Sequence, residues 1–423
     1  AARRAGHTVE ILECLFAQDI DAEIAAHIAR FQPDVIGVSI RLVHGYIIDA
    51  AAPYNTRHLD LRTNVKRVVA AVRRATDAPL VLGGPGFNYY ARDWLEYLDL
   101  DYGICGEADF SFPLFLQRLA EGGNLDDVPG CACRRDGQFH AQPRDWVQDL
   151  DATALPAYDL LDLARYQAAG ISPGILTKRG CAFLCNYCPY RALEGARYRL
   201  KSPARVVDEM EHIRRTFPAK MIMFCENNFN VPKRHAEAIC RAIIDRGAES
   251  PWGTGDLRPL GITDDFCRLL KDSGCGYVSL SIESGSDKML RAMRRGYTVA
   301  DVEQSLACLQ KSGIPFGASL MLGAPGETPE TVGESFALLD RYAIPCGTWV
   351  TVGVCLWTPL QAVLAEARQA GQLPDERMLF AGANYLSPEL PRSFMEDFIA
   401  ALRTKPGYTV QVNQPYAGYR WEN

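Results

Sequence analysis

Three cysteines lie within eight residues near the middle of the chain: Cys181, Cys185 and Cys188. Gly180 precedes them and Pro189 follows them, which predicts a loop on which the three sulfurs converge. Cysteine thiolates are the usual ligands of iron–sulfur clusters, and four of them normally complete a four-iron cube. A loop that supplies only three would leave one iron open for a substrate or a cofactor, as a catalytic zinc site leaves an open position.

Zinc is the competing interpretation of this motif. A zinc site needs a fourth ligand and usually a second Cys or Cys/His pair at finger spacing, and the neighbouring sequence supplies no such pair. Cys131 and Cys133 form a Cys-x-Cys pair that we expect on one strand of a hairpin. The remaining cysteines are scattered among apolar segments and are expected to be small buried hydrophobes: Cys14, Cys105, Cys225, Cys240, Cys267, Cys275, Cys308, Cys346 and Cys355.

The composition is that of a globular protein with two or three domains, because 48% of the 423 residues are hydrophobic and 23% are charged. A net charge of -6 argues against a nucleic-acid partner held through its phosphates. No apolar run reaches about 18 residues, so we expect no membrane span. Fourteen cysteines without a secretion signal predict a reducing, cytoplasmic location.

Short apolar runs alternate with amphipathic stretches over residues 1–125, which predicts a Rossmann-like α/β domain with a parallel sheet. In such sheets a ligand binds beyond the carboxyl ends of the strands. Polar residues and glycines at those ends are the candidate binding residues: Ser39, Arg41, Gly83, Gly84, Gly86, Gly106 and Glu107. We expect strands at 8–12, 35–40, 80–82 and 102–105, and helices at 21–31, 63–76 and 111–121.

Residues 126–172 are rich in turns and are expected to form a linker with a small hairpin. Residues 173–355 show about six strand–helix units, fewer than a complete eight-unit barrel contains, so a partial (β/α)6 barrel is predicted. Residues 356–423 are expected to form a short α-rich tail on the substrate side. The barrel strands are expected at 175–177, 221–224, 252–254, 277–282, 316–321 and 348–352. The barrel helices are expected at 204–215, 233–246, 264–272 and 328–341, with two more near 287–311, and the helices of the tail at 360–371 and 393–403.

Catalytic groups in such barrels collect at the carboxyl ends of the strands. Arg258 follows the third expected strand and is suited to bind a carboxylate through two hydrogen bonds. Each of these residues could instead have a purely structural role: Glu283, for example, could form a salt bridge with Arg291 or Arg295. The candidates at the other strand ends are Glu226, Ser281, Glu283 and Gly323.

The three-cysteine motif, followed in register by residues 224–230, 279–285 and 323–328, resembles the radical S-adenosylmethionine (SAM) superfamily. The resemblance implies a [4Fe-4S] cluster whose open iron is chelated by SAM, and reductive cleavage of SAM to methionine and a 5'-deoxyadenosyl radical. It also implies that Glu226 holds the amino end of SAM and that residues 279–285 bind its ribose and methionine part. The turn at residues 323–328 would lie on the adenine side.

Residues 33–39, 82–87 and 101–107 resemble the cobalamin-binding domain that precedes many radical SAM cores. The alternative is that each is only a tight strand-to-helix turn. The resemblance implies that the first strand of the domain lies outside this chain. No Asp-x-His-x-x-Gly motif for an axial ligand is present, so Arg41 and His44 could face the lower side of the corrin. The alternative for His44 is a loop histidine at the surface. The loop at residues 42–61 is expected to cover the cofactor with Tyr46, Tyr54, Asn55 and His58.

These resemblances imply a cobalamin-dependent radical SAM enzyme of the class B methyltransferase type, which methylates an unactivated carbon or a phosphinate phosphorus of a small metabolite. They also imply an external flavodoxin-like or ferredoxin-like electron donor. Cyclisation or rearrangement with the same cofactors is the first alternative. A non-catalytic iron–sulfur redox sensor is the second.

Overall fold

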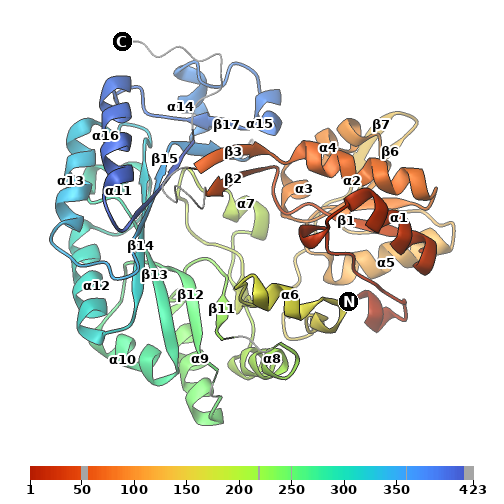
Figure 1. The fold of residues 1–423 in the computed structure, drawn as a ribbon, viewed down its shortest axis with the longest axis horizontal. Coiled ribbons are helices and arrows are strands. Elements are labelled where there is room, and N and C mark those ends of the chain that lie inside the picture. The colour runs from red at the N-terminus through yellow and green to blue at the C-terminus, as the bar shows by residue number, and fades with distance from the viewer. Residues whose placement is uncertain (49–55, 218–219, 249, 359, 414–423) are drawn as a thin grey trace. The chain divides into compact units, whose positions relative to one another are not determined.

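The chain folds into two compact units in the computed structural model (Figure 1). Unit 1 contains residues 1–45 and 59–169, and unit 2 contains residues 46–58 and 170–423. The residues that the structure describes are 1–48, 56–217, 220–248, 250–358 and 360–413.

Unit 1 is built around a five-stranded sheet in the order β1-β4-β5-β6-β7. The first three strands are parallel, and β6 and β7 form a hairpin that pairs antiparallel with β5. This sheet confirms the Rossmann-like α/β fold expected for the N-terminal region. The strands are β1 (Ile36–Ser39), β4 (Leu80–Gly83), β5 (Tyr102–Ile104), β6 (Cys131–Arg135) and β7 (Gln138–Ala141).

The helices of unit 1 pack apolar side chains against this sheet, with Phe87, Trp94 and Phe115 fully buried. Trp94 also donates a hydrogen bond from its indole nitrogen to the carbonyl of Gly86, which satisfies its polar atom. The helices are α1 (Ile20–Phe31), α2 (Arg62–Ala75), α3 (Pro85–Tyr89), α4 (Ala91–Leu98), α5 (Ala108–Ala120) and α6 (Leu163–Ala168), with single 3-10 turns at Ala2–Ala5, Cys14–Phe16 and Tyr158–Leu160.

Three features of this region differ from the expectations. Residues 42–61, expected to form a loop, contain two paired strands, His44–Ile48 and Thr56–Asp60. Residues 8–12 were expected to form a strand, but they pair with no strand of the described sheets. The hairpin within residues 126–172 is part of the unit 1 sheet, with Gly103 paired to Ala132. Cys131 and Cys133 lie on that hairpin strand and are both buried, as expected of residues two apart on one face.

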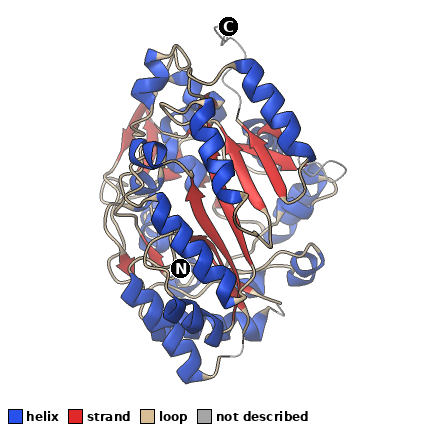
Figure 2. Ribbon diagram, turned by 90° about the vertical axis from the view of Figure 1, so that its left-hand side faces the viewer, coloured by secondary structure: helices blue, strands red, loops and turns tan. Residues whose placement is uncertain are grey.

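Unit 2 is built around an open parallel sheet in the order β18-β15-β14-β13-β12-β11-β8, and Figure 2 shows its strands side by side. The six expected strands are all present, and the partial barrel is confirmed. The strands are β8 (Gly174–Ile175), β11 (Ile222–Phe224), β12 (Trp252–Leu257), β13 (Cys275–Glu283), β14 (Phe316–Leu322), β15 (Thr348–Val352) and β18 (Tyr408–Val412).

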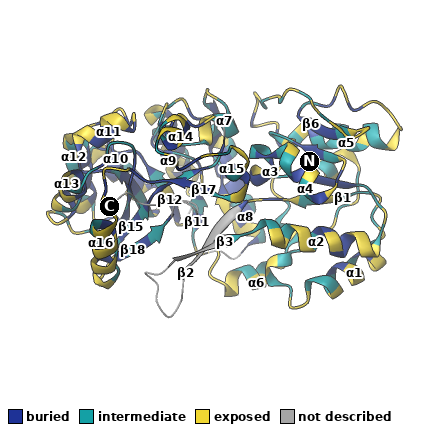
Figure 3. Cartoon of the chain, turned by 90° about the horizontal axis from the view of Figure 1, so that it is seen from above, coloured by how far each residue is buried: buried dark blue, intermediate teal, exposed yellow. Residues whose placement is uncertain are grey.

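Local signals set the helix ends in unit 2. Thr298 and Thr328 each begin a helix with a capping box, in which the side chain bonds a backbone N–H of the first turn. Figure 3 shows the outer helices with exposed residues on one side and buried residues on the other. The helices are α7 (Tyr190–Glu194), α8 (Pro203–Thr216), α9 (Lys233–Arg246), α10 (Asp264–Asp272), α11 (Asp287–Ala292), α12 (Val299–Ser312), α13 (Pro329–Leu339), α14 (Leu364–Gln369), α15 (Arg377–Ala381) and α16 (Arg392–Thr404).

Three short two-stranded pairs complete the described secondary structure. In unit 2, the tail contributes more than the expected helices, because β18 is a seventh strand that pairs with β15. The pairs are β9 (Lys178–Arg179) with β10 (Arg199–Leu200), β16 (Val354–Leu356) with β17 (Ala383–Tyr385), and β2 (His44–Ile48) with β3 (Thr56–Asp60).

The expectation that the scattered cysteines are all buried is wrong for two of them. Cys225 and Cys346 are exposed, because both lie where the chain leaves or enters a strand rather than inside one. Cys240, Cys267 and Cys275 are buried as expected, and the other four are half-buried. No helix among the described residues is long and apolar enough to cross a membrane.

Candidate active site

The carboxyl ends of the parallel strands in unit 2 meet at one edge of the sheet, as they must when neighbouring strands run in the same direction. Glu226 lies two residues after β11, and Arg258 directly follows β12. Glu283 is the last residue of β13, and Gly323 directly follows β14. The residues predicted from four different motifs therefore lie along a single edge.

The three-cysteine loop follows β8 at the same edge. Cys181 is buried, whereas Cys185 and Cys188 are half-buried. Burial raises the pKa of the Cys188 thiol to about 12, and the nearby thiols of Cys185 and Cys181 add to this rise. The three sulfurs are thus near enough to influence one another electrostatically.

Gly180 allows the tight entry into this loop. Its φ of +94° is rare for any residue with a side chain, and an added Cβ would lie 2.0 Å from the carbonyl oxygen of Arg197. The backbone of Cys181 then donates a hydrogen bond to the carbonyl of Gly195 at 3.0 Å. The first cysteine is therefore fixed by backbone contacts to the segment that follows α7.

Asn186 fastens the far part of the loop. Its backbone N–H donates to the carbonyl of Met293 at 3.4 Å, and its side-chain amide donates to Ala292 at 3.2 Å. Its carbonyl accepts a bond from the N–H of Val363, and the Gln361 amide donates to the neighbouring carbonyl of Tyr187. Two distant segments thus hold the loop in one conformation.

The guanidinium of Arg258 is buried, and two of its nitrogen atoms are available to bind an anion. Its side chain is 1% exposed, and its Nε and Nη1 atoms have no hydrogen-bond partner among the described residues. The guanidinium lies over the ring of Phe183 in the cysteine loop, 3.6 Å from the ring centroid, and 4.9 Å from that of Tyr297. A carboxylate bound here would pair with the guanidinium directly beside the cysteine loop.

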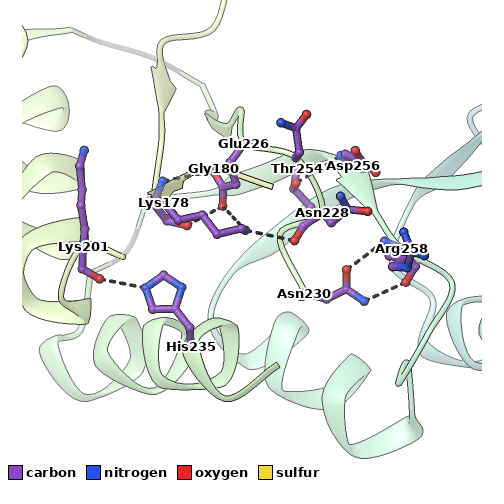
Figure 4. Close-up of polar contacts among 12 residues, drawn as sticks. Lys178, Gly180, Lys201, Glu226, Asn228, Asn230, His235, Thr254, Asp256 and Arg258 are labelled. Atoms are coloured by element: carbon purple, nitrogen blue, oxygen red, sulfur yellow. Dashed lines mark hydrogen bonds and ion pairs between the residues drawn. The ribbon is translucent and has the colours of Figure 1, made fainter. Parts of the chain in front are cut away.

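Asn230 fixes the backbone that carries this arginine, as Figure 4 shows. Its side-chain oxygen accepts a bond from the N–H of Arg258 at 2.9 Å, and its amide donates to the Arg258 carbonyl at 2.8 Å. Asn230 was not among the predicted residues, and it positions the arginine without contacting its charged group.

The Glu226 carboxylate accepts hydrogen bonds from Thr177, which lies just after β8. The Thr177 hydroxyl donates to Oε1 at 2.6 Å and the Thr177 N–H donates to Oε2 at 3.2 Å. The buried amine of Lys178 lies 3.8 Å from Oε1 and donates to the carbonyl of Asn228 at 3.1 Å (Figure 4). Burial lowers the pKa of Lys178 despite the nearby Glu226 carboxylate.

Ser281 and Glu283 of β13 have different polar partners. The Ser281 hydroxyl donates to Asp256 at 2.5 Å, which links the ends of β12 and β13. Glu283 has a φ of +64° and lies 3.7 Å from Arg295, and of the two arginines considered for it, the structure places Arg295 there. Burial raises the pKa of the Glu283 carboxyl, and Arg295 partly offsets that rise.

Gly285, two residues after Glu283, permits close packing against a helix. An added Cβ at Gly285 would lie 2.6 Å from the Cα of Ser335 on α13. The Ser335 hydroxyl instead accepts a bond from the Gly285 N–H at 2.9 Å. The segment that resembles a ribose-binding motif is therefore anchored directly to a helix.

The turn after β14 is closed by a buried carboxyl. Glu327 is fully buried, and its Oε2 accepts a bond from the Gly323 N–H at 2.5 Å. Its Oε1 has no hydrogen-bond partner among the described residues. Burial raises the pKa of Glu327 to about 8, although backbone N–H groups of Gly323 and Ala324 oppose the rise. The carboxyl is therefore mostly protonated at neutral pH.

This shift predicts a pH dependence of stability. Between its ordinary pKa and about 8 the folded chain binds a proton that the unfolded chain has lost, so stability falls as pH rises, by at most about 1.4 kcal/mol per pH unit. Glu327→Gln removes this titration, and its melting temperature should fall less than that of the parent between pH 6 and pH 8.5. Glu334→Gln on the exposed side of α13 is the control, and equal falls in all three proteins would contradict the prediction.

The candidate cobalamin-binding residues in unit 1 also cluster at strand ends. Gly84 follows β4 with a φ of +91°, and an added Cβ would lie 2.6 Å from the carbonyl oxygen of Ile40 after β1. The N–H of Gly86 donates to that same carbonyl at 2.8 Å. The two glycines thus bring the β4 turn against the end of β1.

Gly106 and Glu107 follow β5 in the same way. The Gly106 N–H donates to the side-chain oxygen of Asn88 at 2.8 Å, and Glu107 accepts a bond from the N–H of Val147 at 2.9 Å. Glu107 also borders a cavity of about 240 Å³ at this end of β5.

The end of β1 presents open surface. Gly37 and Ser39 are exposed on the same face of the strand, and a Cβ at Gly37 would meet no atom within 4 Å. Arg41, two residues beyond, is exposed as well. This arrangement fits a cofactor tail lying along the strand ends. Of the four residues expected to cover the cofactor, Tyr54 and Asn55 lie outside the described residues. Tyr46 and His58 lie on β2 and β3, and the structure does not describe their side chains.

Gly84→Ala tests whether this turn is needed for the cofactor. We expect the strained φ and the contact with Ile40 to destabilise the chain by roughly 1–3 kcal/mol and to displace the turn, so that bound cobalt falls. Gly122→Ala is the control, because Gly122 also has a positive φ but open space around it, and it should cost about 1 kcal/mol with cobalt unchanged. Full cobalt binding by Gly84→Ala would contradict the role of this turn.

Among the described residues, no three His, Cys, Asp or Glu side chains are arranged to hold a single metal ion. A cube differs from such a site, because each cysteine binds a different iron and the sulfurs do not share one centre. Three neighbouring thiols lie beside a guanidinium whose Nε and Nη1 have no hydrogen-bond partner among the described residues, which fits a cluster together with a ligand that carries a carboxylate.

Models of two known families match this chain. The Radical SAM superfamily matches residues 175–339, and the B12 binding domain matches residues 1–116. The strand edge with its three-cysteine loop therefore belongs to a radical SAM enzyme. More particularly, the chain is a B12-binding radical SAM enzyme related to the class B radical SAM methyltransferases, and its cofactors are a [4Fe-4S] cluster, SAM and cobalamin.

Three curated relatives are an uncharacterized methyltransferase of Pyrococcus horikoshii, the tryptophan 2-C-methyltransferase of Streptomyces laurentii and an anaerobic magnesium-protoporphyrin IX monomethyl ester cyclase of Synechocystis. They are 28, 25 and 25% identical over 78, 63 and 73% of this chain, respectively. The chain spans 69, 55 and 60% of their lengths. The fold is shared with the methyltransferase TsrM of Kitasatospora setae, with a TM-score of 0.73 at 23% identity over 88% of this chain and 71% of that one.

Sequence reasoning missed several residues around the site. Lys178 and Asp256 stand beside predicted residues but were not predicted to act. Arg295 and Tyr297 are buried in the connection between α11 and α12, although an arginine between two helices is usually exposed. The one available signal was the six-residue connection 293–298, which links the short helix α11 to the longer helix α12.

Proposed function

We propose that this chain is a cobalamin-dependent radical SAM methyltransferase that acts on an unactivated carbon or a phosphinate phosphorus of a small metabolite. The observation that carries the proposal is the presence in one chain of a B12-binding domain and a radical SAM sheet edge with an unpaired buried arginine beside three cysteines. Relatives named as methyltransferases support it.

In this proposal Cys181, Cys185 and Cys188 bind the cluster. Arg258 pairs with the carboxylate of SAM, and Glu226 accepts a hydrogen bond from the amino group of SAM. Thr177 and Lys178 hold the Glu226 carboxylate in place. When bound, the cofactors supply reductive cleavage of SAM and transfer of its methyl group. The protein residues orient SAM and exclude water from the sheet edge.

The remaining proposed residues support the other parts of the ligands. Ser281 and Glu283 lie on the strand end assigned to the ribose and methionine part, and Gly323 begins the turn on the adenine side. In unit 1 the proposed cobalamin contacts are Ser39, Arg41, Gly83, Gly84, Gly86, Gly106 and Glu107. We further propose a small flavodoxin-like or ferredoxin-like electron donor in a reducing cytoplasm, since the cluster requires a reductant.

A second candidate function is cyclisation or rearrangement without methyl transfer. The observation that favours it is the similarity to anaerobic magnesium-protoporphyrin IX monomethyl ester cyclases, which match 73% of this chain in one case. The two functions use the same cofactors and differ in whether the methyl group reaches the product.

Deuterated SAM separates these functions. The reconstituted full chain is incubated with methyl-deuterated SAM, a reductant and a panel that includes tryptophan and a cytidylyl 2-hydroxyethylphosphonate, the compounds named for two relatives. A product that carries the deuterated methyl group, formed only with cobalamin, is expected. An isomerised or cyclised product without label would contradict methyl transfer and favour the second candidate.

A further inference from the structure

Arg295 connects the cysteine loop to the strand edge. It lies in the turn after α11, and its side chain is almost completely buried. Nη1 donates a hydrogen bond to Cys185 Sγ at 3.4 Å and to the Tyr187 hydroxyl at 2.7 Å. The arginine thus contacts both a proposed cluster ligand and a neighbouring residue of the same loop.

The opposite side of the guanidinium is fixed equally well. Nε donates to the Tyr297 hydroxyl at 2.9 Å, and that hydroxyl in turn donates to the carbonyl of Ser281 at 2.8 Å. Nη2 lies 3.7 Å from the carboxylate of Glu283. With contacts on both sides, the charged group is held beside Cys185 and cannot turn away to solvent.

A buried positive charge with an N–H···S bond has a definite effect on a cluster. Reduction adds one negative charge, so a cation beside a ligand sulfur stabilises the reduced state more than the oxidised state. Hydrogen bonds to cluster sulfurs act in the same direction and are among the factors that set the reduction potential. Water screens the charge little here, because the arginine is 6% exposed.

We propose that Arg295 is a positioning residue that raises the reduction potential of the cluster through its contact with Cys185. The proposal rests on the ligation of the cluster by Cys185 and is independent of methyl transfer. An arginine is required, because only its planar fork can bond Cys185, Tyr187 and Tyr297 at the same time. Without this contact the cluster would have a lower reduction potential, and the external donor would reduce it less readily.

The test is a redox titration of the reconstituted full chain without SAM or substrate, in which the reduced cluster is followed by electron paramagnetic resonance. For Arg295→Met we expect the ratio of reduced to oxidised cluster at a fixed potential to fall at least tenfold, which is about 59 mV for a one-electron couple. Arg295→Lys should fall between this variant and the parent. Arg291→Met, at an exposed arginine on α11, is the matched control and should leave the ratio unchanged.

Iron is counted in every variant, because the counts separate the possible failures. An unchanged potential in an Arg295→Met protein with a full cluster would overturn the inference. If Arg295→Met binds no cluster, Arg295→Lys decides, and a potential equal to that of the parent would overturn the inference. If the parent chain itself binds no cluster, the proposed ligation fails, and this inference fails with it.

Discussion

Cys185→Ala is expected to abolish both the cluster and SAM cleavage. About four irons per reconstituted parent chain should fall to background, because a cube with two protein ligands and an exposed edge is not retained. The loss of 5'-deoxyadenosine should exceed the roughly 10- to 100-fold effect typical of removing an outer partner of a metal site. Iron analysis and chromatography of the SAM products measure the two effects.

Cys346→Ala is the control for this substitution, because Cys346 is an exposed cysteine outside the motif. It should retain iron and cleavage at the level of the parent. If Cys185→Ala kept four irons and cleaved SAM, the three-cysteine loop would not be the cluster site. Cys181→Ala and Cys188→Ala are expected to behave as Cys185→Ala does.

Arg258→Met is expected to weaken SAM binding while leaving the ligand-free chain at least as stable as the parent. Removing one partner of a buried charge pair costs about 2–5 kcal/mol, so the Kd for SAM should rise roughly 30-fold or more. Without a ligand the guanidinium is buried and lacks partners for Nε and Nη1 among the described residues, so its removal relieves a desolvation penalty. Loss of affinity and unchanged or increased stability should therefore occur together.

Isothermal titration with SAM and thermal unfolding of the ligand-free chain measure these two quantities. Arg268→Met on the exposed side of α10 controls for the general loss of a positive charge. Unchanged SAM affinity in Arg258→Met would show that the carboxylate binds elsewhere. A large drop in stability would show that Arg258 has a structural role instead.

The parts of the fold that depend on local patterns could be predicted from the sequence. Helices α9 and α10 have the expected bounds, because Gly247 ends one in a left-handed conformation and Thr263 caps the other. The six strands expected in the unit 2 sheet, from β8 to β15, follow the same alternation. The strand β18 could not be predicted, because its five residues are stabilised by pairing with β15, which lies more than fifty residues earlier.

The candidate site was predictable only in part, for a related reason. Glu283 was recognised as a strand-end residue, but its partner could have been Arg291 or Arg295, and only the packing of α11 decides between them. The burial of Lys178 and the unpaired state of Arg258 depend on contacts among separate strands. Residue types and spacing thus indicate the class of cofactor, whereas the electrostatics of the site require the folded chain.

The most direct test of the account is anaerobic reconstitution of the full chain with iron, sulfide and hydroxocobalamin, followed by SAM and a strong reductant. We predict about four irons and about one cobalt per chain, together with 5'-deoxyadenosine. Iron and SAM cleavage without cobalt would contradict the cobalamin-dependent function and leave a radical SAM enzyme that uses unit 1 in another way. A full cluster without SAM cleavage would contradict the catalytic role of the sheet edge.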